Sequence, residues 1–197
     1  MNTKMRLFSL FLLATIFAVG LASATTLAQW NLTTNGIASN INANINAGDF
    51  TAGSGVSAIT FTVDGATTNG WTINANKDAN DYYQITLSPK TGYNLVINSI
   101  NFGERRTLDG ITKYTVEWSK NFDFSSATTI ATVVVPSDNN ERISNITGLN
   151  INVNNSETIY IRWFGYSANA AGTPTWRVND NTLNIEGTAT VVSTPST

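Results

Sequence analysis

Arginines that stand within a few residues of a Phe, Tyr or Trp are the side chains of this sequence best suited to chemistry. A guanidinium is a planar, forked donor, and an aromatic ring can pack on the apolar face of a sugar, so the combination is typical of a glycan-binding surface. The residues that we predict to form such a face are Arg106, Arg162, Tyr166 and Arg177. In the alternative, each arginine pairs with a nearby carboxylate and lies over a sheet.

Two oxygen-rich segments could hold a hard cation. Asp78 lies within the Asn- and Asp-rich segment 74–81, and Asp180 stands between Asn179 and Asn181. Ca²⁺ takes roughly six to eight oxygen ligands, so Asp78 and Asp180 are candidates for a structural calcium site. The spacing lacks the central glycine and the bidentate glutamate of an EF-hand loop, and an ordinary turn is the alternative. We expect no other cofactor.

The residue types that are missing exclude several classes of catalysis. The chain of 197 residues has no cysteine and no histidine, which excludes a thiol nucleophile, an imidazole base and the ordinary zinc and copper sites. Glu117 is the only carboxylate expected in the middle of a strand, and the sequence indicates no facing pair for glycoside hydrolysis. We therefore expect a protein that is not an enzyme. With 12% charged residues and a net charge of −2, we also expect no nucleic-acid partner.

The first 24 residues are typical of a secretory signal peptide. Lys4 and Arg6 precede an apolar run, 7–21, and small residues at 22–24 supply a cleavage site. The alternative of a membrane anchor is less fitting, because the run is shorter than the roughly 20 residues that span a bilayer. We predict a signal peptide at 1–24, a folded domain at 25–187 and a Thr/Ser/Pro-rich tail or linker at 188–197. The mature protein is then secreted or at the cell surface, with no membrane insertion after cleavage.

The composition and periodicity of the rest of the chain predict an all-β protein. It is rich in Thr, which favours strands, and in Asn, which favours turns. Apolar residues alternate with polar ones in several segments, as in 82–88 and 112–119, which is the period of a half-buried strand. The candidate strands are 27–32, 58–63, 70–74, 82–88, 93–102, 112–119, 128–135, 143–153, 157–165, 174–179 and 181–187. The segment 35–55 shows little alternation and is expected to be a long loop or an irregular edge.

One strand requires an irregularity. In 93–102 the apolar phase runs through Leu95 and Ile97 and then shifts to Ile100. An extra residue at Asn98-Ser99, in a β-bulge, would restore the inward phase. About ten short antiparallel strands in a domain of this length favour a two-sheet β-sandwich of the jelly-roll type. An up-and-down barrel stays open as an alternative.

Five short segments carry a resemblance to a known family. They are Ala28–Asn31, Tyr82–Tyr93, Ile100–Arg106, Tyr160–Tyr166 and Thr175–Asn181. Together they resemble an extracellular module of large bacterial secreted proteins, found beside lamin-tail-like, extracellular endonuclease and type IX sorting domains. The resemblance implies a jelly-roll sandwich similar to carbohydrate-binding modules, without a catalytic role. The family usually ends in Trp-Arg-Ile/Val-Asp-Asn, whereas here Asn179 occupies the acidic position.

These observations predict a secreted, non-catalytic module that binds glycans or cell-surface polymers in an adhesion or accessory role. The alternative is a structural subunit of an extracellular filament, sheath or matrix. Such a subunit would self-associate through open sheet edges. A third interpretation is a fragment of a secreted nuclease or hydrolase.

Overall fold

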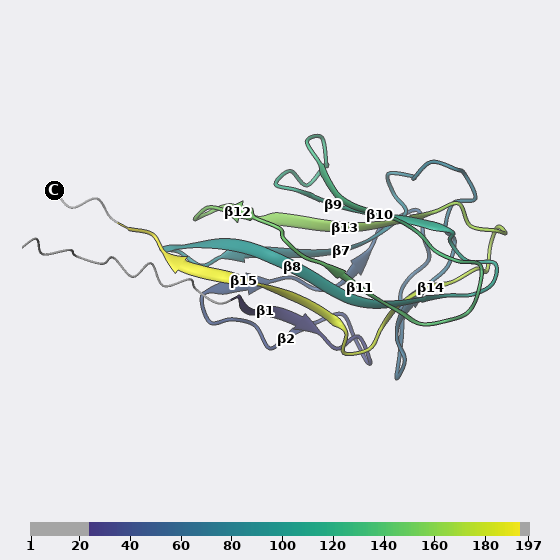
Figure 1. Ribbon diagram of the computed structural model, residues 1–197, viewed down its shortest axis with the longest axis horizontal. Helices are drawn as coiled ribbons and strands as arrows, with labels where there is room; N and C mark the ends of the chain where they lie inside the picture. The colour runs from purple at the N-terminus through teal and green to yellow at the C-terminus, as the bar shows by residue number, and fades with distance from the viewer. Residues whose placement is uncertain (1–23, 194–197) are drawn as a thin grey trace, which may run out of the picture.

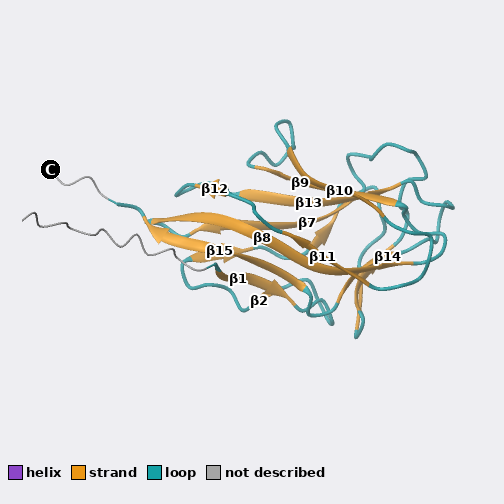
Figure 2. Ribbon diagram, in the orientation of Figure 1, coloured by secondary structure: helices purple, strands orange, loops and turns teal. Residues whose placement is uncertain are grey.

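The structure is a computed structural model that describes residues 24–193. Within this range all regular elements are β-strands, and they form two stacked antiparallel sheets (Figures 1 and 2). The predicted signal peptide, 1–24, lies outside the described residues except for residue 24, and so does the end of the predicted tail, 194–197. Among residues 24–193 there is no helix long and apolar enough to cross a membrane.

The larger sheet, which we call sheet A, has nine strands built around the long strand β8. Its strands are β2 (Ala38–Ser39), β1 (Thr25–Trp30), β15 (Leu183–Val191), β8 (Tyr93–Arg106), β14 (Trp176–Asn179), β6 (Gly65–Thr68), β5 (Thr60–Thr62), β11 (Arg142–Ile146) and β12 (Ile151–Val153). Asn101 of β8 pairs with Asn184 of β15 and also with Asn145 of β11. The strands β15 and β11 therefore lie on opposite edges of β8.

The smaller sheet, sheet B, has six strands. They are β10 (Thr128–Val134), β9 (Lys113–Ser119), β13 (Ile159–Tyr166), β7 (Tyr82–Pro89), β3 (Ile45–Ala47) and β4 (Thr51–Ala52). Successive strands cross repeatedly from one sheet to the other: β7 lies in sheet B, β8 in sheet A and β9 in sheet B again. This crossing is the pattern of a jelly roll, and the predicted two-sheet antiparallel sandwich is confirmed.

The predicted strand at 70–74 is wrong. The strand in this region is β6, which ends at Thr68. Gly70 has a φ of +88°, a left-handed conformation that turns the chain away from the sheet. Trp71 then inserts its ring into the core, and its indole Nε1 donates a hydrogen bond to the carbonyl of Thr68 at 3.1 Å.

Other differences concern the number and the ends of strands. The predicted strand 143–153 is two strands, β11 and β12, and Gly148 lies between them with a φ of +71°. The expected irregular segment 35–55 contains the short strands β2, β3 and β4. The strand β15 continues past Gly187 to Val191 and pairs with the beginning of β8. The tail predicted from residue 188 therefore begins, within the described residues, as part of sheet A.

The predicted bulge in β8 is confirmed. Glu186 of β15 pairs with Ser99, and the next residue, Gly187, pairs with Ile97. Asn98 is the extra residue, and its carbonyl accepts a hydrogen bond from the amide of Leu149 at 3.0 Å. Because the bulge absorbs one residue, both Ile97 and Ile100 are buried in the core.

Large aromatic residues fill the space between the sheets. Trp71, Tyr83, Tyr114 and Trp176 have ring centroids 5.1 to 5.4 Å apart from one neighbour to the next, and none exposes more than 2% of its surface. The hydroxyl of Tyr83, from sheet B, donates a hydrogen bond of 2.6 Å to the carbonyl of Trp176 in sheet A. We call these four residues the aromatic cluster. It couples the two layers by packing and by a buried hydrogen bond.

We expect the substitution Tyr83→Phe to lower the free energy of unfolding by about 1 to 2 kcal/mol, because it removes a buried hydrogen bond between the sheets and keeps the ring. The matched control is Tyr160→Phe, because the Tyr160 hydroxyl makes no hydrogen bond within residues 24–193 and the side chain is half-buried on the outside of sheet B. This control should change stability by less than about 0.5 kcal/mol. Urea titration of both variants measures the effect, and equal values would contradict the role given to the Tyr83 hydroxyl.

Candidate functional site

The outer face of sheet B carries a groove whose floor comes from strands β9 and β13. In β13, Ile161 and Trp163 point into the core, and the alternation of a strand therefore sends Arg162, Phe164 and Tyr166 outward. On β9, Glu117 is the register partner of Arg162, and Thr115 is the register partner of Phe164. The Tyr166 hydroxyl shares a hydrogen bond of 3.2 Å with the Thr115 hydroxyl.

Two loops form the walls of this groove. Segment 74–80 lies on one side, and loop 120–127, between β9 and β10, rises from sheet B (Figure 1). The groove consists of two adjoining hollows of about 410 and 380 Å³, which share Lys77 and Glu117. The first is lined by Lys77, Ala79, Glu117, Asp123, Phe124, Ser125, Ala127, Arg162 and Phe164. The second is lined by Ala75, Asn76, Lys77, Thr115, Glu117, Thr129, Thr132 and Tyr166.

Arg162 holds loop 120–127 against the sheet. The central carbon of its guanidinium lies 3.9 Å from the ring centroid of Tyr82 and 3.9 Å from that of Phe124, between the two rings. Its Nε donates to the side chain of Gln84 at 2.7 Å, and its Nη2 donates to the carbonyl of Phe122 at 3.0 Å. Burial lowers the pKa of Arg162, yet an arginine stays charged at neutral pH. The contacts with two rings and two oxygens replace its lost hydration.

Phe124 adopts an unusual backbone conformation in this loop. Its φ is +57°, which is rare and strained for a bulky residue. The conformation brings its ring onto Arg162 and within 6.0 Å of the ring of Phe164. The strained residue is thus one that lines the groove, as is common where a loop must present a side chain to a ligand.

An ion pair between Lys77 and Glu117 separates the two hollows. The Lys77 ammonium pairs with the Glu117 carboxylate and lies 4.6 Å from the ring centroid of Phe164. Thr129 of β10 donates a second hydrogen bond to the same carboxylate oxygen at 2.9 Å. Glu117 is buried, whereas 40% of the Lys77 side chain is exposed. Reasoning from the sequence did not identify Lys77 or Phe124. The outward alternation of Glu117 in its strand was the available signal for that residue.

The four predicted ligand residues do not share one face, and this part of the prediction is wrong. Arg162 and Tyr166 lie together in the groove on sheet B. Arg177 lies on the outer face of sheet A, where it pairs with Asp64 at 3.3 Å and with Glu141. Arg106 is the register partner of the buried Trp176, so its side chain points toward the interior. The alternative of carboxylate pairing holds for Arg177 and not for Arg162.

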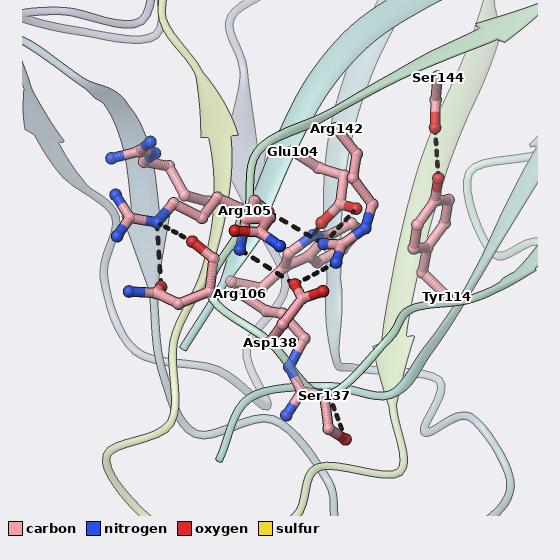
Figure 3. A network of polar contacts seen from close by, with 12 residues as sticks. Glu104, Arg105, Arg106, Tyr114, Ser137, Asp138, Arg142 and Ser144 are labelled. Atoms are coloured by element: carbon pink, nitrogen blue, oxygen red, sulfur yellow. Dashed lines mark hydrogen bonds and ion pairs between the residues drawn. The ribbon is translucent and has the colours of Figure 1, made fainter. Parts of the chain in front are cut away.

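Arg106 belongs to a polar network at the end of the sandwich (Figure 3). Its Nε donates to the carbonyl of Thr107 at 2.8 Å and its Nη1 to the hydroxyl of Ser137 at 3.3 Å. Nearby, Arg142 pairs with Asp138 and lies 3.7 Å from the carboxylate of Glu104. The network joins the end of β8 to the loop that precedes β11, and it leaves Arg106 only 1% exposed.

Glu104 is the buried acid of this network. It exposes 1% of its surface and accepts a hydrogen bond from the indole of Trp176 at 3.2 Å. Burial raises its pKa above the ordinary value of 4.5, against the opposing effects of Trp176, Arg142 and Arg106. Burial also raises the pKa of Tyr114, whose hydroxyl contacts that of Ser144 at 2.6 Å, to about 12.

The two calcium candidates lie in turns. Asp78 accepts a hydrogen bond from the amide of Asn80 at 2.8 Å, and Asp180 accepts one from the side chain of Asn181 at 2.9 Å. Across residues 24–193 there is no cluster of three or more His, Cys, Asp or Glu residues that could hold a metal ion. The turn alternative accounts for both segments, and a structural calcium ion stays a prediction.

Comparisons with known proteins return similarity only at the level of structure. No family model matches the sequence, and neither does any curated protein. Among solved structures, a variant of the carbohydrate-binding module CBM29-2 has 12% identity and a TM-score of 0.43, with 85% of this chain and 92% of that chain covered. A Cellvibrio japonicus xylanase 10C variant with xylopentaose has 11% identity and a TM-score of 0.41, with 79% of this chain and 28% of that one covered. A cellulose-binding domain from Cellulomonas fimi has 9% identity and a TM-score of 0.33, with 77% and 90% covered.

The raised pKa of Glu104 predicts how the stability of the protein depends on pH. The folded protein binds a proton at Glu104 more tightly than the unfolded chain does. The stability that this group contributes is therefore present below pH 4.5 and lost as the pH rises through the raised pKa. We expect the free energy of unfolding of wild type, minus that of Glu104→Gln, to fall as the pH rises from 4.5, because glutamine does not titrate. Urea titrations at several pH values measure this difference.

The control for this prediction is Asp138→Asn in the same network. The hydrogen bond from Arg142 lowers the pKa of Asp138 below its ordinary value of 3.8. The stability contributed by Asp138 is therefore present above that value and lost as the pH falls. The wild-type advantage over Asp138→Asn should then rise as the pH increases toward 3.8 and stay nearly constant at higher pH. A wild-type advantage over Glu104→Gln that is constant or rises with pH would contradict the effect of burial at Glu104.

Proposed function

We propose that this chain is a non-catalytic module that binds glycan chains in the groove on the outer face of sheet B. The observation that carries the proposal is the combination of aromatic rings and polar groups in this groove. Phe124, whose side chain is partly exposed, provides apolar surface that packs against the carbon-bound face of a sugar ring, whereas Phe164 and Tyr166 are buried, 3% and 9% exposed, and lie beneath that surface in the floor of the groove. Lys77 and Glu117 add a donor and an acceptor near the middle of the groove, where hydroxyl groups can exchange hydrogen bonds with them.

The state of the carboxylates in the groove supports binding rather than hydrolysis. Asp123 accepts a hydrogen bond from the amide of Ser125, and this lowers the pKa of Asp123. A glycosidase needs a carboxylic acid with a raised pKa to protonate the leaving oxygen. Glu117, the other acid that lines the groove, is already paired with Lys77 and Thr129.

The proposal includes an extracellular setting, in an adhesion or accessory role. Its support is the sequence of residues 1–24, with a basic beginning, an apolar run and small residues at the end. The alternative of a filament subunit is not proposed; at one edge of sheet B, the strand β10 is irregular. The register with β9 shifts between Thr129 and Ala131, and such a bulge hinders strand addition by a neighbouring molecule.

A glycan array followed by calorimetry tests the groove. We expect wild type to bind one or more neutral glycans and Phe124→Asn to bind them about tenfold more weakly, because a stacking ring is lost. Asparagine tolerates the left-handed backbone of this position, and the hydrogen bond from Arg162 to the carbonyl of Phe122 still ties the loop to the sheet. The matched control is Ile143→Asn, which removes a 65% exposed apolar side chain from sheet A and should change affinity less than about twofold. A wild-type protein that binds no glycan, or equal affinities for the two variants, would overturn the proposal.

A further inference from the structure

A second pocket lies on the outer face of sheet A, away from the groove. Thr67 of β6, Arg177 of β14 and Arg105 of β8 stand in one row across three neighbouring strands. The pocket above them has a volume of about 230 Å³ and is lined by Thr67, Arg105, Arg106, Thr107, Asn139, Thr175 and Arg177. Neither a carboxylate nor an aromatic ring is among these residues. The lining thus suits neither a metal cation nor a stacked sugar ring.

Arg105 and Arg177 are register partners on neighbouring strands, an arrangement of like charges that is unfavourable unless something compensates for it. The charge of Arg177 is compensated within the protein. Its two terminal nitrogens pair with Asp64 and Glu141, and its Nε donates to the side chain of Asn179 at 3.0 Å. Arg177 therefore has little capacity left for a ligand.

The Arg105 side chain is held in place at Nε, and its two terminal nitrogens are available to a ligand. Its Nε donates to both the carbonyl and the side-chain oxygen of Asn139, at 3.0 Å each (Figure 3). Within residues 24–193, its Nη1 and Nη2 donate to no acceptor, and no carboxylate lies within ion-pair distance of it. Neither nitrogen is a buried atom without a partner, so both are open to solvent. A guanidinium that is fixed at Nε and open at both terminal nitrogens fits an oxyanion with two parallel hydrogen bonds.

We infer that this pocket binds one oxyanion group, a carboxylate or a sulfate ester, carried by an acidic polysaccharide. The oxyanion follows from the open fork of Arg105 and the acid-free lining, and the polysaccharide rests on the proposed function. The volume of about 230 Å³ is below the roughly 300–1,000 Å³ of sites that enclose whole ligands. The pocket therefore takes a charged substituent while the rest of the chain stays outside.

The test measures binding of wild type and Arg105→Gln to three polymers at physiological salt: polygalacturonate, dextran sulfate and neutral dextran. We expect wild type to bind at least one acidic polymer more tightly than dextran, and Arg105→Gln to lose at least about tenfold of that affinity. A preference for polygalacturonate identifies a carboxylate as the ligand group, and a preference for dextran sulfate identifies a sulfate. Arg105→Lys keeps the charge without the fork and should lose most of the same affinity.

The matched control is Lys90→Gln, which removes one positive charge from an exposed turn between β7 and β8 and should change affinity less than about threefold. The inference is overturned if wild type binds both acidic polymers no better than dextran, or if Arg105→Gln and Lys90→Gln bind alike. The groove variant Phe124→Asn separates the two proposals. If Phe124→Asn loses binding to neutral glycans and still binds the acidic polymer, the two sites are separate. If Phe124→Asn loses binding to both, the inference of a separate oxyanion pocket is overturned.

Discussion

The contact between the two sheets through the aromatic cluster is the constraint on which the other features of the structure depend. Trp176 of sheet A and Tyr83 of sheet B meet through their rings and through a hydrogen bond. Trp71 fits beside them only because Gly165 has no side chain: a Cβ there would lie 2.8 Å from the Trp71 ring. Since strand residues alternate between faces, the inward position of Gly165 obliges Phe164 and Tyr166 to face outward, into the groove.

The same constraint separates the arginines. Trp163 and Trp176 both point inward, so the neighbouring Arg162 and Arg177 both point outward, but from opposite sheets. Two residues that look alike in sequence, each next to a tryptophan, therefore belong to opposite surfaces of the molecule. Arg106 points inward instead, because it is the register partner of Trp176. Its guanidinium donates hydrogen bonds to carbonyls and a hydroxyl at the end of the sandwich.

The fold was largely predictable from the sequence, whereas the site was predictable only in part. Alternation within a strand is a local property, and it was sufficient to identify most strands, the bulge at Asn98 and the outward direction of Arg162 and Arg177. Which sheet a strand joins depends on contacts distant in sequence, so the expectation of a single arginine face failed. Lys77 and Phe124 lie in loops, where no periodicity operates, and their positions over Phe164 and Arg162 arise only from tertiary packing.

Because the chain has few charged residues, the partners that the protein provides for each of them are informative. Glu117 is buried and pairs with Lys77 and Thr129, Arg177 pairs with two carboxylates, and Arg162 contacts two rings and two oxygens. In each case the protein supplies the partners that burial of a charge requires. Arg105 differs from these: the protein orients it through Asn139 and yet provides its terminal nitrogens with no acceptor among the described residues. Orientation of a charged fork has an entropic cost, and a ligand that uses the fork offsets that cost.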